Sequence, residues 1–196
     1  IVRCIARACA PLLDGEDEDD ITRLWLKVAR HPPLQWIGRA GISHLALAAI
    51  DIALWDLKAQ RAGQPLWRLL GGATKPTVTA YNTDIGWLSL PDDDLVAGAR
   101  RAVQEEGFRG VKIKIGSPEL SRDLRRLEAV RRAIGPGVMM ATDVNGRWDL
   151  PTALRFAREA DGLDVFWIEE PLWYDDLAGH EALARASSVP VALGEQ

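Results

Sequence analysis

The sequence predicts an α/β fold: a partial parallel (β/α) barrel of about five of the eight usual units, preceded by a helical segment. Near residue 75 a helical pattern gives way to short apolar runs that alternate with longer amphipathic ones. Three acidic residues then close successive apolar runs at intervals of 26 residues, the length of one strand, loop, helix and loop. We therefore divide the chain into residues 1–74 and 75–196.

Composition narrows the class of protein. The chain has 196 residues, of which 47% are hydrophobic and 27% charged, as in ordinary globular proteins. A net charge of −4 leaves no basic stripe, so we expect no nucleic-acid or membrane partner. Cys4 and Cys9 are too few for a disulfide framework, which favours a reducing, cytoplasmic location. The most apolar stretch, 42–57, is too short and too polar to span a bilayer.

The first part of the chain is predicted to be helical. Residues 1–13 run into the acidic GEDEDD instead of a cleavage site, so we interpret them as structure and not as a signal sequence. The acidic run suits the start of a helix over 21–29. Ser43 is predicted to cap the next helix, whose wide apolar surface indicates burial on more than one side, and Gly63 and Pro65 end it. The missing initial methionine and the end directly after a strand suggest a piece of a longer protein.

From Pro76 onward, strands and helices are predicted to alternate. We expect strands at 77–82, 110–115, 138–144, 165–169 and 190–194, and helices at about 92–106, 119–134, 150–160 and 176–187. Crossovers of this length give parallel strands, joined right-handedly, with helices on the outside. Such strands belong either to an open doubly wound sheet or to part of an eight-stranded barrel.

The lysines of the strand at 110–115 favour the barrel. Val111, Ile113 and Ile115 share one parity, and Lys112 and Lys114 share the other. An open parallel sheet is covered on both faces, so it would bury both lysines in an apolar layer at high cost. In a barrel they point inward, toward the acids at the strand ends. The alternative for the lysines is an exposed face on an edge strand.

The three evenly spaced acids predict a metal site. Asp143, Glu169 and Glu195 would occupy the same end of three successive parallel strands, where a barrel places its active site. Carboxylates gathered at one rim need a cation, and a hard ion such as Mg²⁺ takes oxygen ligands. Any one of these acids alone could instead cap a helix or lie in solvent, but three in phase argue against that.

Five sequence runs resemble a known family. AAIDIALWDLKAQRAGQPLWRLLGG, KIKIG, TDVNGRWD, WIEEPL and LGEQ, in this order, resemble the enolase superfamily, in particular its mandelate racemase subgroup of acid-sugar dehydratases and racemases. The resemblance covers nearly the whole chain. It implies that residues 1–74 are the C-terminal helical portion of an α+β capping domain and that 75–196 are the first part of a truncated TIM-type barrel.

The resemblance also implies roles for the strand-end residues. Asp143, Glu169 and Glu195 would bind Mg²⁺. Lys114 would be the general base, and Lys112 would lie nearer the substrate carboxylate and polarise it.

Neighbouring polar residues are assigned less specific roles. Asn145 would contact the substrate or support the ligands, and Arg147 would either meet a substrate carboxylate or cap the loop with Asp149. Glu170 is expected to support the ligands and not to bind the metal itself. Residues 81–83, at the end of the first predicted strand, either contact the substrate or are structural.

The activity implied by the resemblance is Mg²⁺-dependent abstraction of the proton α to a carboxylate. Dehydration of a sugar acid through an enediolate is our leading interpretation, with the small carboxylate substrate as the ligand and a homo-oligomer as the expected assembly. A racemase or epimerase, or a muconate-cycloisomerase-like enzyme, is the first alternative, although Glu195 and the EEP run favour the racemase subgroup. A non-catalytic β/α scaffold is the second.

The histidines are expected to be ordinary surface or core residues and not a second acid or base. His31, His44 and His180 all lie away from the predicted strand ends. In the family, the second acid/base lies on strands beyond the fifth, so dehydration and racemisation cannot be separated from these residues. We also expect that the 196-residue segment alone neither folds stably nor turns over substrate, because five strands cannot close a barrel.

Overall fold

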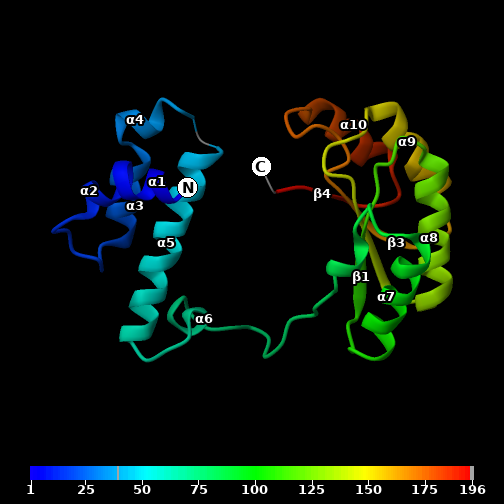
Figure 1. Ribbon diagram of the computed structural model, residues 1–196, viewed down its shortest axis with the longest axis horizontal. Coiled ribbons are helices and arrows are strands. Elements are labelled where there is room, and N and C mark those ends of the chain that lie inside the picture. The colour runs from blue at the N-terminus through cyan, green and yellow to red at the C-terminus, as the bar shows by residue number, and fades with distance from the viewer. Residues whose placement is uncertain (39, 195–196) are drawn as a thin grey trace. The chain divides into compact units, whose positions relative to one another are not determined.

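The computed structural model describes residues 1–38 and 40–194, which form two compact units. The first unit is Ile1–Thr77 and the second is Val78–Gln196 (Figure 1). Each is described by itself. Within the described residues, no helix is both long enough and apolar enough to cross a membrane.

Within the described residues, the first unit consists of helices joined by loops. Its elements are α1 (Val2–Cys4), the π-helical turn η1 (Ile5–Cys9), α2 (Ala10–Leu13), α3 (Ile21–Ala29), α4 (Pro32–Gln35), α5 (Ile42–Arg61) and α6 (Leu66–Leu69). The opening segment is therefore folded, as predicted, and the predicted helix over 21–29 has the bounds of α3. Residues from four of these elements form a small core: Cys9, Val28, Leu34, Ala46 and Leu47.

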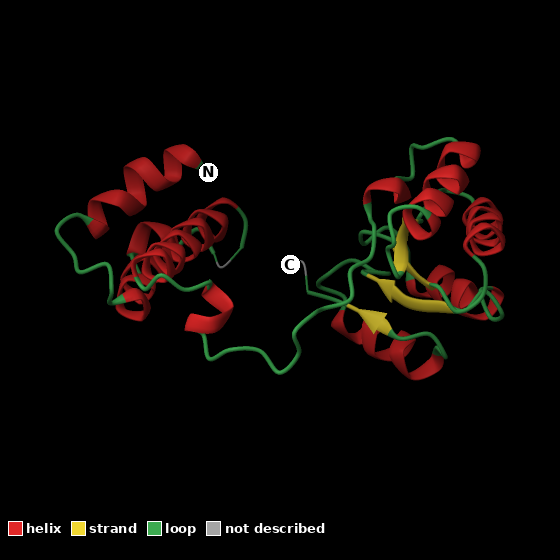
Figure 2. Ribbon diagram, turned by 90° about the horizontal axis from the view of Figure 1, so that it is seen from below, coloured by secondary structure: helices red, strands yellow, loops and turns green. Residues whose placement is uncertain are grey.

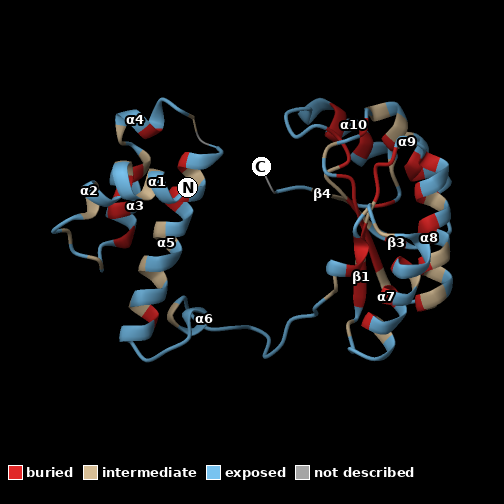
Figure 3. Ribbon diagram, in the orientation of Figure 1, coloured by how far each residue is buried: buried red, intermediate tan, exposed pale blue. Residues whose placement is uncertain are grey.

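Helix α5 differs from its prediction in two ways. Gly41, with a φ of 68°, precedes its first turn in place of Ser43, whose hydroxyl donates instead to the carbonyls of Gly38 and Ala40, both at 3.4 Å. Only four of its residues are buried, and much of the helix is exposed (Figure 3). Ile42 and Ile52 are more than 60% exposed. The cause is that the neighbouring helices of the small first unit cover only one stripe of this long helix.

The second unit is a parallel sheet with helices between its strands. The strands are β1 (Gly110–Lys114), β2 (Met139–Asp143), β3 (Val165–Glu169) and β4 (Val191–Ala192), and the helices are η2 (Asp84–Gly86), α7 (Asp92–Gln104), α8 (Leu120–Ile134), α9 (Leu150–Glu159) and α10 (Leu177–Ala186). The strand order is β1-β2-β3-β4, and each described pair is parallel. Helices α7–α10 lie around the outer side of the sheet (Figure 2). A sheet that winds in one direction without reversing its order is the wall of a barrel and not a doubly wound sheet.

The two outermost predicted strands are wrong in extent. The segment at 77–82 does not form a strand: Asn82 makes an isolated bridge with Val111, and the Ala80 carbonyl accepts from the Arg109 N–H at 3.3 Å. Val78, near the start of this segment, is 89% exposed. The strand predicted at 190–194 shortens to β4. Both lie at the edges of the sheet that the structure describes, where a backbone has a partner on one side only, so an apolar run there does not become a full strand.

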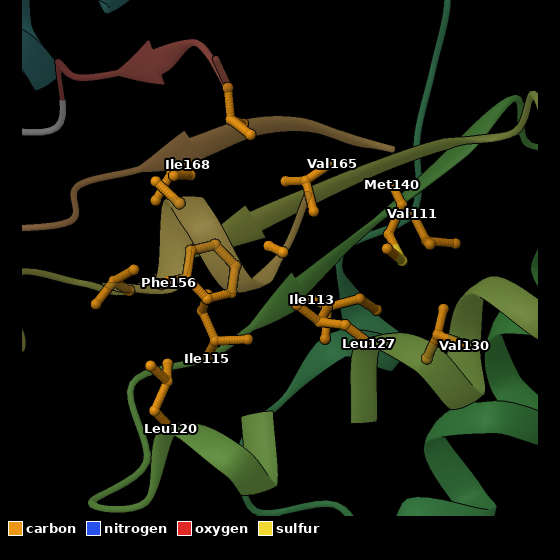
Figure 4. Packing of buried hydrophobic residues seen from close by; sticks show 14 of the residues in the cluster. Val111, Ile113, Ile115, Leu120, Leu127, Val130, Met140, Phe156, Val165 and Ile168 are labelled. Carbon is orange, nitrogen blue, oxygen red and sulfur yellow. The ribbon is translucent and has the colours of Figure 1, made fainter. Parts of the chain in front are cut away.

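The core of the second unit lies between the sheet and its helices. Val111, Ile113 and Ile115 are at most 1% exposed, and they pack toward Leu127 and Val130 of α8 (Figure 4). The lysines of β1 have the opposite parity and leave this layer. The predicted division of the strand into an apolar and a charged face is therefore confirmed.

Candidate active site

A cluster of four charged side chains lies at the carboxyl end of the sheet. Lys114 pairs in register with Asp143, and Asp143 pairs with Glu169, so three neighbouring strands present these groups in one row. Lys112 Nζ lies 3.1 Å from Asp143 Oδ2 and 2.6 Å from Glu169 Oε1. Lys114 Nζ lies 2.6 Å from the same Asp143 oxygen. The structure thus brings together both predicted lysines and two of the three predicted metal ligands.

Burial and charge act against each other in this cluster. The side chain of Asp143 is 1% exposed and that of Lys112 is 13% exposed. Burial alone would raise the pKa of Asp143, but the hydrogen bonds from Lys114 and Lys112 outweigh it and hold the pKa below its usual value. Burial lowers the pKa of Lys112, and its bonds to Glu169 and Asp143 reverse the direction, so the net pKa is raised. Both groups are therefore held in their charged forms.

Asn145 joins the cluster through a sharp turn after β2. Its Oδ1 accepts a hydrogen bond from Lys114 Nζ at 2.8 Å, and its own N–H donates to Asp143 Oδ1 at 3.1 Å. A φ of 52° at Asn145, followed by 71° at Gly146, turns the chain back toward the strand end. The side chain predicted to contact the substrate thus lies beside the predicted base.

Trp167 contributes a contact that the sequence analysis missed. Its indole N–H donates to Glu169 Oε2 at 3.0 Å, while the other carboxylate oxygen, Oε1, accepts from Lys112. Residues 167 and 169 share a strand face, so alternation alone places the Trp167 side chain on the same side of the sheet as Glu169. The parity was the available signal, but it carries no information about where the indole N–H points. Trp167 also meets Tyr81 edge to face, with ring centroids 5.6 Å apart.

Glu170 and Arg147 lie in two different pockets. Glu170 has a φ of 43° and lines a pocket of about 510 Å³ together with Asn145, Trp173 and Tyr174. Arg147 lines another pocket of about 330 Å³, with Asp149 and other residues around the start of α9. Within residues 1–38 and 40–194, none of the hydrogen bonds and ion pairs of the lysine–carboxylate cluster involves Arg147, and its role in substrate binding stays a prediction.

The remaining candidates are placed as follows. The Asn82 carboxamide oxygen accepts from the N–H groups of Asp84 and Ile85, at 2.9 and 3.3 Å, and so begins η2. His180 is buried in α10, where its Nδ1 is paired with the Asp176 carbonyl at 2.8 Å. Glu195, the third predicted ligand, lies outside the described residues. Residues 1–38 and 40–194 contain no group of three His, Cys, Asp or Glu side chains arranged to hold a metal ion.

Two family descriptions match the chain. Residues 94–196 match the family described as "Enolase C-terminal domain-like". Residues 1–71 match the N-terminal domain of the mandelate racemase / muconate lactonizing enzyme family. Together these matches account for most of both units.

Individual relatives cover nearly all of this chain. L-talarate/galactarate dehydratase of Salmonella typhimurium is 42% identical over 194 residues, which are 97% of this chain and 47% of that protein. The 3,6-anhydro-alpha-L-galactonate cycloisomerase of Streptomyces coelicolor is 40% identical over 92% of this chain and 49% of its own length. The chain thus spans about half the length of the curated relatives it matches.

Solved structures agree with this relationship. L-talarate dehydratase from a Polaromonas species, complexed with Mg and L-glucarate, is 44% identical with a TM-score of 0.88, over 97% of this chain and 52% of that one. A racemase from Streptomyces coelicolor with bound magnesium is 38% identical with a TM-score of 0.92, over 98% and 53%. The sheet, its strand-end charges and these matches together show that the chain belongs to the mandelate racemase / muconate lactonizing enzyme family of the enolase superfamily.

Proposed function

We propose that this chain forms part of a Mg²⁺-dependent enzyme that removes the proton α to the carboxylate of a sugar acid and then eliminates water. The observation that carries the proposal is the row of Lys112, Lys114, Asp143 and Glu169 at one end of the parallel sheet. Relatives named as talarate/galactarate and arabinonate dehydratases support the reaction class. A cytoplasmic location and a homo-oligomeric state stay predictions.

The donor set of the site fits Mg²⁺. Asp143 and Glu169 present hard oxygen donors from adjacent strand ends, and both carboxylates are already engaged by positive charge at 2.6 Å. We assign Asp143, Glu169 and Glu195 as the residues that hold the ion. When bound, Mg²⁺ stabilises the second negative charge that develops on the substrate carboxylate as the α-proton leaves.

Lys114 is the group that we assign to proton transfer. Its ammonium lies among Asp143, Asn145 and the ring of Trp87, whose centroid is 5.8 Å from Nζ, and its side chain is 20% exposed. Once the ammonium has released a proton to water, the neutral Nζ takes the α-proton, and the electron pair of the broken C–H bond moves onto the carboxylate to form the enediolate. Lys112, charged and less exposed, donates to that carboxylate. The β-hydroxyl then leaves as water with a proton from an acid outside these residues.

A cycloisomerase or racemase is the second candidate. It shares the proton abstraction by lysine and differs in the fate of the enediolate, which is reprotonated or closes a ring instead of losing water. This second candidate function is supported by 40% identity to a protein named as a cycloisomerase and 38% identity to a structure named as a racemase. The products formed from one substrate panel separate the two.

The experiment is performed on the protein of full natural length. It is incubated in D₂O with Mg²⁺ and a panel of hexarates and pentonates, and NMR follows exchange at Cα and release of the dehydrated product. We expect exchange that EDTA abolishes, and elimination with at least one acid. Lys114→Met should remove exchange, whereas Lys75→Met, at an exposed site, should leave it unchanged. Exchange that survives in Lys114→Met, or that needs no divalent metal, would contradict the proposal.

A further inference from the structure

Helix α8 carries two buried charged side chains one helical turn apart. Asp123 is 0% exposed and Arg126 is 1% exposed. Burial of a charge is costly unless hydrogen bonds compensate it. Neither residue belongs to the lysine–carboxylate cluster, so the question is which parts of the fold they hold.

Asp123 binds the backbone immediately after the predicted base. Its Oδ2 accepts from the N–H groups of Gly116 and Ser117, both at 2.9 Å, and Lys114 lies two residues before Gly116. The N–H of Ile115 donates to the Asp143 carbonyl at 2.9 Å. Every backbone N–H from residue 115 to 117 is therefore fixed.

The turn that Asp123 holds leaves little room for adjustment. Gly116 has a φ of +102°, which a residue with a side chain rarely adopts. A Cβ there would lie 3.2 Å from both Arg147 Cδ and the Val144 carbonyl oxygen. The end of β1 is thus held from α8 on one side and packed against the loop after β2 on the other.

Arg126 binds the segment on the other side of Lys114. Its Nη1 donates to the Leu90 carbonyl at 2.9 Å and to the Asp92 carboxylate, and its Nη2 donates to the Trp87 carbonyl at 3.2 Å. Trp87 is the residue whose ring lies 5.8 Å from Lys114 Nζ. The guanidinium therefore fixes the backbone that carries the aromatic neighbour of the base.

The segment that carries Trp87 is also packed directly on β1. A Cβ on Gly86 would lie 2.0 Å from the Lys112 carbonyl oxygen, so only glycine allows this approach. Any shift of this segment would consequently be transmitted to the lysine strand.

We propose that Asp123 and Arg126 are positioning residues that set the location of the Lys114 ammonium by holding the two segments beside it. This inference rests on the proposed function, in which Lys114 takes the proton. Within the described part of the chain, Asp123 Oδ1 and Arg126 Nε are buried without a hydrogen-bond partner. Part of the free-energy cost of burying these two side chains is therefore not compensated by hydrogen bonds. This is expected where the geometry of a site takes precedence over stability.

The same helix supplies a matched control. Arg131 is also an arginine of α8, with a side chain 13% exposed, and it binds backbone carbonyls. Its partners are the carbonyls of Leu163, Gly135, Val138 and Asp164, at 2.7–3.0 Å. These precede β2 and β3, at the opposite end of the strands from Lys114.

The first test measures the kinetics of Cα-proton exchange by the protein of full natural length. We expect Asp123→Ala and Arg126→Ala to lower kcat about 10–100-fold with KM little changed, because a misplaced base affects the transition state more than binding. Asp123→Asn should keep most of the wild-type kcat, because a single side-chain oxygen at this position accepts from the N–H groups of both Gly116 and Ser117. Arg131→Ala should lower the melting temperature but keep kcat per folded molecule. An equal loss of kcat in Arg131→Ala, or wild-type kcat in Asp123→Ala, would overturn the proposal.

The second test does not depend on activity. The folded proteins are treated with acetic anhydride. Peptide mass spectrometry then measures the acetylation rate of Lys114 relative to that of the exposed Lys75. We expect a changed Lys114 rate in Asp123→Ala and Arg126→Ala, and the wild-type rate in Arg131→Ala and Asp123→Asn. If no sugar acid shows exchange, the proposed function fails, while this labelling still decides the positioning role. Identical Lys114 rates in all the variants would refute it.

Discussion

Glu169 is oriented by two donors from different strands. Lys112 Nζ reaches Oε1 at 2.6 Å and the Trp167 indole N–H reaches Oε2 at 3.0 Å. A carboxylate held at both oxygens keeps one orientation, which is what a metal ligand needs before the ion arrives. The tryptophan is thus a support for the proposed metal site.

Removal of the indole N–H should weaken the metal site without emptying the barrel interior. In Trp167→Phe an aromatic ring remains near Tyr81, but the bond to Glu169 is lost. We expect Mg²⁺ affinity to fall about 10–100-fold, measured by calorimetric titration of the protein of full natural length. Trp25→Phe, in α3 of the first unit, is the control. Unchanged Mg²⁺ affinity in Trp167→Phe would show that the indole does not orient the ligand.

At the residue scale, strand parity explains what could be predicted. Alternation in KIKIG places Lys112 and Lys114 on one face, and spacing places Asp143 and Glu169 at the strand ends, and the structure joins all four. Parity fails where the backbone leaves the strand. Asn145 and Glu170 have positive φ, so their side chains point where the local turns direct them and not where alternation would. The Asn145-Gly146 pair is a known turn signal, whereas nothing in the local sequence predicts the positive φ of Glu170.

At the scale of elements, helices were predicted better than edge strands. A helix such as α8 can be recognised from its own sequence, because its apolar residues recur with the helical period. Its buried positions include Leu120, Leu127, Val130 and Ile134. A strand also depends on neighbours. The apolar run at 77–82 has β1 beside it but makes one bridge, and α5 has an apolar surface that its unit does not cover. The local sequence does not show which other segments will pair with a strand or cover a helix.

The acidic loop before α3 predicts a pH effect on stability. Hydrogen bonds from Lys27 and Arg23 lower the pKa of Glu16. A carboxyl with a lowered folded-state pKa stabilises the fold fully above its unfolded value, about 4.3, and loses this contribution as pH falls through the folded value. We therefore expect Glu16→Gln to lower the melting temperature at pH 7 and to have little effect at pH 2.

The measurement is a series of thermal melts of the protein of full natural length at several pH values and at low and high salt. The Glu16 effect should shrink in high salt, because exposed ion pairs are screened. Glu128→Gln, at an exposed site on α8, is the control and should melt like the wild type throughout. A Glu16→Gln difference that grows as the solution becomes acidic would contradict the assignment.

For the whole molecule, the described surface contains features that an independent domain usually buries. Ile52 on α5 is 66% exposed and Val78, beside the sheet, is 89% exposed. The parallel sheet has two edges within the described residues, where free backbone groups attract other chains. The chain covers about half of its curated relatives.

We therefore expect the 196-residue polypeptide, produced alone, to unfold without a cooperative transition and to bind a hydrophobic dye such as ANS. Circular dichroism during heating and dye fluorescence at 25 °C are the measurements, with the protein of full natural length as the control. A single sharp and reversible transition of the short polypeptide, with no dye binding, would show that the two units are self-sufficient.

The unbroken order β1-β2-β3 has a consequence for how this chemistry can be inherited. The two lysines and two of the carboxylates come from three consecutive strands, encoded by one short stretch of the gene. Recombination at either border of that stretch would move these four side chains together, whereas the proposed third ligand, Glu195, and Trp87 lie outside it.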